Sequence, residues 1–178
     1  MKQDLAEDFT AHLKKLAGEG GRQPNRAALA ELRRSLTQAP GTYVRAYRYV
    51  PPYVHNLFDR QRDAYFLVAG LFATHSDVAA DETLGASIKK LYLEKDSSDS
   101  VEKRFITLLD ADETQLPYRL RQMISLLRSE GIPVDYLSLL KHLTSWDHPE
   151  RWVQRRWARD FYRQSYDTLE KDDSERAA

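Results

Sequence analysis

The sequence predicts an all-α protein, a compact bundle of seven to nine helices. Three observations support this class. Apolar residues recur at three- and four-residue spacing along most of the 178-residue chain, no alternating strand pattern of useful length occurs, and glycine or proline separates the periodic segments. The chain also allows a division into two lobes near residues 76–100, where the sequence becomes polar and acidic.

The first half of the chain contains four periodic segments. Leu5, Phe9 and Leu16 mark the first, and Gly18 ends it. The expected helices cover residues 3–17, 25–38, 43–50 and 59–74. The last of these is apolar nearly all round between residues 65 and 72, so we expect it to be a buried central helix.

The second half predicts five more helices, with Gly131 as a left-handed cap between two of them. They cover residues 83–94, 101–110, 115–129, 136–143 and 149–166. These segments suggest an N-terminal helical lobe over 1–76, an acidic helix and linker over 77–100, a C-terminal helical lobe over 101–166 and a disordered tail over 167–178.

The charges are segregated, although the formal net charge is +0. Residues 22–62 hold eight arginines and two acids, whereas residues 77–116 hold ten acids and five bases. Arginine outnumbers lysine eighteen to nine, and its planar fork suits phosphate and carboxylate groups. A GC-rich coding sequence explains the abundance of arginine equally well, but it does not explain the clustering.

The last predicted helix carries the clearest basic face. At 100° per residue, Val153, Trp157 and Phe161 share an arc that can pack on the core. The remaining arc presents five cations, which are Arg151, Arg155, Arg156, Arg159 and Arg163. This row matches the spacing of a phosphate backbone. A solvated helix face or an interface with an acidic partner fits it equally well.

Other basic positions are less specific. Arg33 and Arg34 form a pair on an early helix, while Arg119, Arg121 and Arg128 lie on a helix whose other face is rich in leucine. Each set can contact phosphates, and each can also be an ordinary solvated surface.

No catalytic constellation is visible in the sequence. There is no cysteine, and no two of the five histidines have the i, i+4 spacing of a helical zinc site. We therefore expect no enzyme activity, no cofactor and no metal. The acidic N-terminus lacks the pattern of a signal peptide and no apolar run is long enough for a membrane span, so we expect a cytoplasmic protein without membrane contact.

Several segments, taken in order, resemble the CasB family, the small subunit of the type I-E CRISPR surveillance complex, Cascade. The resemblance covers about 130 residues, and each motif is weak alone. The matching segments are Leu29–Arg34, Asp59-Arg60, Ser100–Leu109, Leu120-Arg121, Leu126-Leu127, Pro133–Tyr136, Leu139-Leu140, Trp146 and Val153–Phe161.

The resemblance implies a two-lobed helical protein that assembles with a second copy of itself as a head-to-tail dimer. It also implies contacts with the backbone and large subunits of Cascade, with guide RNA and with target DNA as the R-loop opens. The family is non-enzymatic. Basic positions of the family motifs fall on Arg33, Arg34, Arg60, Arg104 and Arg121, which we expect to contact phosphates.

The sequence thus predicts a non-catalytic subunit that stabilises an R-loop during antiviral defence. The nucleic-acid contacts are the five arginines implied by the resemblance, together with Arg155, Arg156 and Arg159 from the basic helix face. The alternative is a protein-only adaptor whose basic helical faces dock acidic subunits of an assembly.

Overall fold

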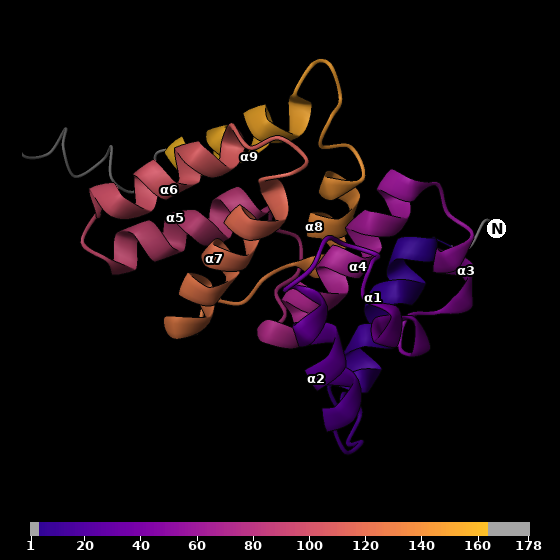
Figure 1. Ribbon diagram of the computed structural model, residues 1–178. Helices are drawn as coiled ribbons and strands as arrows, with labels where there is room; N and C mark the ends of the chain where they lie inside the picture. Colours follow the sequence, from indigo (N-terminus) through magenta and orange to yellow (C-terminus); the bar gives the residue numbers. More distant parts are fainter. Residues whose placement is uncertain (1–3, 164–178) are drawn as a thin grey trace, which may run out of the picture.

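The computed structural model describes residues 4–163, and within this range the chain folds into nine α-helices and one 3₁₀ helix (Figure 1). The all-α class is confirmed. The elements are α1 (Leu5–Leu16), α2 (Arg26–Ser35), η1 (Val44–Arg48), α3 (Pro52–His55), α4 (Asp59–Thr74), α5 (Leu84–Glu94), α6 (Asp99–Leu109), α7 (Leu116–Ser129), α8 (Tyr136–Leu143) and α9 (Trp152–Tyr162). None of them combines the length and apolar character needed to cross a lipid bilayer.

Helix α4 is the central helix, as predicted. Every residue from Ala64 to Ala73 is buried, and α2, α3, α7 and α8 all contact the helix. The C-terminal end of α2 packs closely on Gly70, where an added Cβ would lie 2.6 Å from a methyl carbon of Leu36. The absence of a side chain at this position leaves room for the side chain of Leu36 and for the Leu32 carbonyl oxygen.

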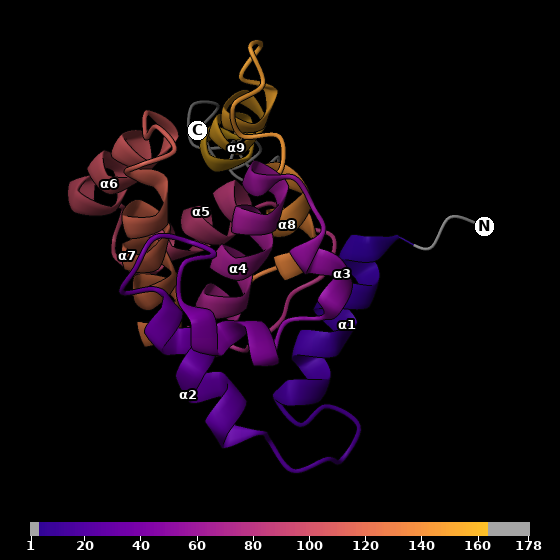
Figure 2. The ribbon, with the colours of Figure 1, turned by 45° about the vertical axis from the view of Figure 1, so that its right-hand side comes forward.

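Helices α5, α6, α7 and α9 form the other side of the molecule, away from α1 and α2 (Figures 1 and 2). Aromatic side chains pack against α9: the rings of Phe105 in α6 and Phe161 in α9 stack with centroids 4.4 Å apart, and Trp146 of the α8–α9 loop lies 5.2 Å from Trp157 of α9. These contacts bury the apolar arc predicted for the last helix.

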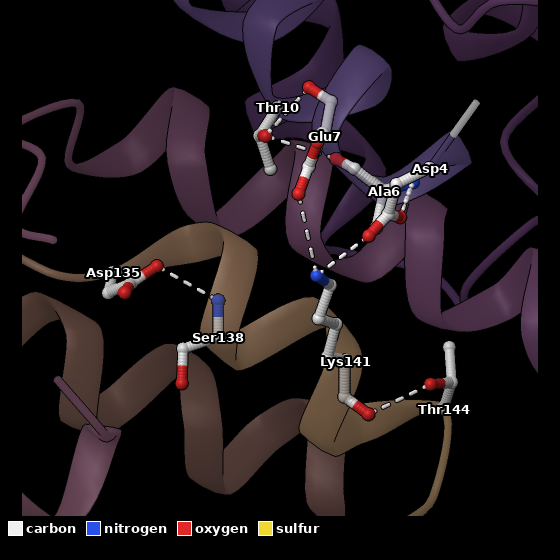
Figure 3. Close-up of polar contacts among 8 residues, drawn as sticks. All are labelled: Asp4, Ala6, Glu7, Thr10, Asp135, Ser138, Lys141 and Thr144. Atoms are coloured by element: carbon white, nitrogen blue, oxygen red, sulfur yellow. Dashed lines mark hydrogen bonds and ion pairs between the residues drawn. The ribbon is translucent and has the colours of Figure 1, made fainter. Parts of the chain in front are cut away.

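Helix α8 packs on α1 and α4, although it follows α7 in the sequence. Lys141 of α8 lies 2.8 Å from a carboxylate oxygen of Asp4 and 3.9 Å from one of Glu7, so an ion pair joins the two helices (Figure 3). The boundaries of the two predicted lobes stay a prediction, since α8 belongs by sequence to the second and packs on helices of the first.

Three local predictions differ from the structure. Residues 43–50 contain a short 3₁₀ helix instead of an α-helix, and Pro52 begins helix α3 instead of only breaking the chain. The last helix begins at Trp152 and not near Pro149, because Arg151 adopts a left-handed conformation with φ of 48°. The predicted end of this helix at residue 166 and the predicted disordered tail lie outside the described residues.

Candidate nucleic-acid interface

Arg33 and Arg34 lie at the end of α2 and both have partners within the chain. The Nε and Nη2 groups of Arg33 donate hydrogen bonds to the Ala73 carbonyl oxygen at 3.1 and 2.7 Å, near the C-terminus of α4. Carbonyl groups at a helix end lack intrahelical donors, so this arginine satisfies one of them. Arg34 pairs with Glu31 at 2.9 Å but keeps 64% of its side chain exposed.

Glu31 is held as a carboxylate by its neighbours. A hydrogen bond from the Tyr43 hydroxyl, together with the charges of Arg34 and Arg45, lowers the pKa of this group below its usual range. Arg34 therefore faces a stable negative charge at neutral pH, and a phosphate that binds it competes with this carboxylate.

Arg60, in the first turn of α4, connects that helix to two loops of the other side. It lies 3.2 Å from a carboxylate oxygen of Glu113, before α7, and 3.1 Å from one of Asp147, before α9. Its side chain is nevertheless 71% exposed. Exposed ion pairs of this kind contribute at most about 1 kcal/mol each, so they leave the guanidinium available for exchange with another anion.

A groove of about 840 Å³ brings Arg60 and Arg121 together. It lies between the start of α4, the loop after α2, the start of α7 and the loop between α8 and α9. Its wall combines apolar side chains, among them Leu67 and Trp146, with both arginines and with the carboxylates of Asp63, Glu113 and Asp147. Arg121 is exposed and forms no ion pair with any carboxylate of residues 4–163.

Arg104 belongs to a second, smaller hollow of about 120 Å³ between α6 and α7, here called the basic notch. The notch is lined by Lys103, Arg104, Thr107, Arg119, Gln122 and Met123. No carboxylate lines it, and within the described part of the chain none of its three cations forms an ion pair. The basic notch is therefore a concentrated positive site.

Helix α9 presents Arg155, Arg156 and Arg159 to solvent, as predicted. None of the three pairs with a carboxylate between residues 4 and 163. Arg151 leaves the predicted row because it precedes the helix. It donates a hydrogen bond to the Leu109 carbonyl oxygen at 2.6 Å and lies 3.7 Å from Asp110, so it ties the start of α9 to the end of α6.

The structure thus sorts the predicted arginines into separate groups. Arg60 and Arg121 share the groove, Arg104 lies in the basic notch, and three arginines share one face of α9. The sequence interpretation did not select Lys103 or Tyr118. Lys103 could have been found, because it stands next to Arg104 in the sequence. Tyr118 could not, because the spacing of a tyrosine does not show whether it is exposed or buried.

Comparisons with known proteins agree with one another. The sequence model of a family described as CRISPR-associated protein Cse2 matches residues 28–162. A CRISPR-associated protein Cse2 from Thermus thermophilus is 43% identical over 159 residues, which cover 88% of this chain and 89% of that protein.

Solved structures extend this likeness to the fold. The crystal structure of CasB from Thermus thermophilus matches with a TM-score of 0.77 and 39% identity, covering 90% of this chain and 99% of the other. A chain of a CRISPR RNA-guided surveillance complex matches with a TM-score of 0.73 and 28% identity, covering 94% and 96%.

Proposed function

The chain belongs to the Cse2 family, and from this membership we propose that it is the non-catalytic small subunit of a type I-E CRISPR surveillance complex, Cascade. In this role it works in the cytoplasm and binds the backbones of guide RNA and target DNA to stabilise the R-loop during antiviral defence. Its partners are the backbone and large subunits and a second copy of itself. The structural relative in a CRISPR RNA-guided surveillance complex supports this assignment.

The proposal that the chain binds nucleic acid rests on exposed arginines that have no carboxylate partner. Arg104, Arg121, Arg155, Arg156 and Arg159 are exposed, and none forms an ion pair within residues 4–163. A phosphate can bind such a guanidinium without first displacing a carboxylate. Arg33, Arg34 and Arg60 are also proposed to contact phosphates, but each must first give up its partner within the chain.

Backbone contacts suit this task energetically. Exchange of a DNA duplex for an RNA–DNA heteroduplex is nearly balanced in base-pairing energy, so contacts from a protein can tip it. The guide supplies the sequence specificity, and arginines that hold phosphates carry none. Helices that are packed on a common core present these side chains at fixed spacing.

The test is a titration of the purified chain with labelled single-stranded and duplex DNA of two unrelated sequences over a range of salt concentrations. The triple variant Arg155→Ala, Arg156→Ala, Arg159→Ala should weaken binding to both sequences equally. It should also lower the slope of log K against log salt by about 0.9 for each duplex phosphate that the variant no longer neutralises.

A charge-matched control separates local contacts from net charge. Lys15→Ala, Arg22→Ala, Arg26→Ala also removes three exposed cations, from the α1–α2 end of the molecule, which lies far from α9 (Figure 1). This control should keep most of the affinity. A wild-type chain that binds neither DNA at low salt, yet joins the assembled complex, would favour the adaptor alternative.

A further inference from the structure

Tyr118 is an exposed aromatic residue that its neighbours hold in place. It lies in the first turn of α7 with 57% of its surface exposed. Its hydroxyl accepts a hydrogen bond from Gln122 Nε2 at 2.8 Å, and the Arg119 guanidinium carbon lies 5.6 Å from its ring centroid. These two contacts hold the ring at the surface of the helix.

The basic notch lies directly beside this ring. Arg119 and Gln122, which contact Tyr118, also line the notch together with Lys103 and Arg104. The Nε atom of Arg119 is buried and has no hydrogen-bond partner within residues 4–163. A buried donor without a partner is costly, and among the described residues no carboxylate beside the notch offsets the charge of this arginine.

The size and charge of the notch suit a phosphate group. Its volume of about 120 Å³ is several times the roughly 10–15 Å³ that one water molecule needs. Two guanidinium groups and one ammonium group surround it, and charge-assisted hydrogen bonds from such groups to phosphate are among the strongest in proteins.

Tyr118 also borders the larger groove on its other side, together with Arg121. The ring thus lies beside the basic notch and borders a groove of mixed charge, whose lining includes Arg60 and Arg121 together with Asp63, Glu113 and Asp147. A base stacked on the ring would bring an adjacent phosphate close to the notch, because Arg119 and Gln122 contact the ring and line the notch. Bases in a duplex are already stacked on both faces, whereas an unpaired base has a free face for an aromatic side chain.

We propose that Tyr118 and the basic notch form a binding site for single-stranded nucleic acid, in which an unpaired base stacks on the tyrosine ring and an adjacent phosphate occupies the notch. This inference rests on the proposed function, because it assumes that the chain binds nucleic acid, and it adds a preference for unpaired strands.

Tyr162 provides the matched comparison. It is similarly exposed, at 52%, and it also lies on a helix. Its hydroxyl, however, donates a hydrogen bond to the Glu102 carboxylate, and burial together with this contact raises the pKa of the phenol to about 12. The negative charge of Glu102 beside this ring repels a phosphate backbone, so Tyr162 should not bind nucleic acid.

The experiment measures the affinity of the full-length variants for a labelled 20-nucleotide oligothymidine strand and for a 20-base-pair duplex by fluorescence anisotropy. Tyr118→Ala should weaken single-strand binding about 5- to 100-fold and leave the duplex affinity unchanged. Its salt slope should stay at the wild-type value, because no charge is removed. Tyr118→Phe keeps the ring and should bind as the wild type does.

The notch is tested separately. Arg119→Gln should lower the single-strand salt slope by about 0.7, the value for one phosphate. Tyr162→Ala should change neither affinity. Thermal unfolding of each variant checks that the fold is intact.

The outcomes separate the two proposals. Wild-type affinity for the single strand in Tyr118→Ala, or an equal loss for strand and duplex, would overturn the stacking site while leaving the proposed function in place. A wild-type chain that binds neither probe at low salt would overturn both.

Discussion

The indole Nε1 of Trp157 donates a hydrogen bond to Nδ1 of His142 at 3.0 Å, and both side chains are buried. Because Nδ1 accepts this bond, the imidazole is neutral and carries its proton on Nε2. Protonation of Nδ1 would break the bond and place a charge in the core. Burial, assisted by the charge of Arg156, accordingly lowers the pKa of His142 from 6.5 to about 4.

The first prediction is a loss of stability in mild acid. Between pH 6.5 and 4 the unfolded chain binds a proton at this histidine and the folded protein does not, so the free energy of unfolding falls as the pH falls. The loss should reach about 3 kcal/mol at pH 4. Urea unfolding at several pH values measures it. His142→Gln should show a flatter profile, because it removes the group that takes up the proton.

The second prediction concerns the contact of α5 with α9. A Cβ added at Gly85 would lie 2.3 Å from the Trp157 carbonyl oxygen and 2.7 Å from its Cα, so the backbones of both helices would have to move. Gly85→Ala should destabilise the protein by about 1–3 kcal/mol, despite the better helix propensity of alanine. Gly70→Ala should cost less, because its nearest contacts belong to the flexible side chain of Leu36. Equal unfolding midpoints for Gly85→Ala and wild type would contradict this packing.

The third prediction separates the two roles of Asp4. It caps α1 by accepting a hydrogen bond from the Ala6 amide at 3.0 Å, and it pairs with Lys141, which lowers the pKa of its carboxyl group (Figure 3). Asp4→Asn keeps a side-chain oxygen that can cap α1 and loses only the ion pair with Lys141. The small loss of stability that it causes should therefore vanish in high salt. Asp4→Ala should still lose about 1 kcal/mol there, as measured by thermal unfolding. Identical behaviour of the two variants at every salt concentration would argue against the cap.

The fourth prediction concerns competition for Arg60. Replacement of both partner carboxylates, Glu113→Gln with Asp147→Asn, leaves the Arg60 guanidinium without its ion pairs. If Arg60 contacts phosphate, this double variant should bind DNA about two- to tenfold more tightly at low salt.

Its control removes the same charge elsewhere. Asp81→Asn with Asp96→Asn changes two exposed residues with φ of 59° and 52°, a conformation that asparagine adopts readily. This control should increase the affinity much less. Adding Arg60→Ala to the first double variant should abolish the tighter binding, and an increase that survives would exclude Arg60 as the contact.

Much of the fold was predictable because it depends on local pattern. The all-α class, the buried central helix and the split of α9 into an apolar and a basic arc follow from the 3.6-residue period alone. Element ends were less predictable. Arg151 is left-handed and its side chain donates a hydrogen bond to α6, a contact that no pattern within the last helix reports.

The candidate site, like the fold, was predictable from the sequence only in part. The helical period identified the exposed arginines of α9, and the family resemblance pointed to Arg104 in α6 and Arg121 in α7, which are also exposed. The sequence could not identify that Arg33 bonds to Ala73 or that Arg60 lies between two carboxylates, because these partners are 40 or more residues distant. Nor could it place Tyr118 between the groove and the basic notch, since that position depends on how α7 packs beside α6 and the α8–α9 loop.

The sequence by itself determined the helical class, the basic character of particular helix faces and the resemblance to the CasB family. Only the tertiary structure decided which cations are neutralised by partners and which ones meet around a common hollow. The physical reason is that helix periodicity is a property of neighbouring residues, whereas charge pairing depends on distances between elements that only packing brings together.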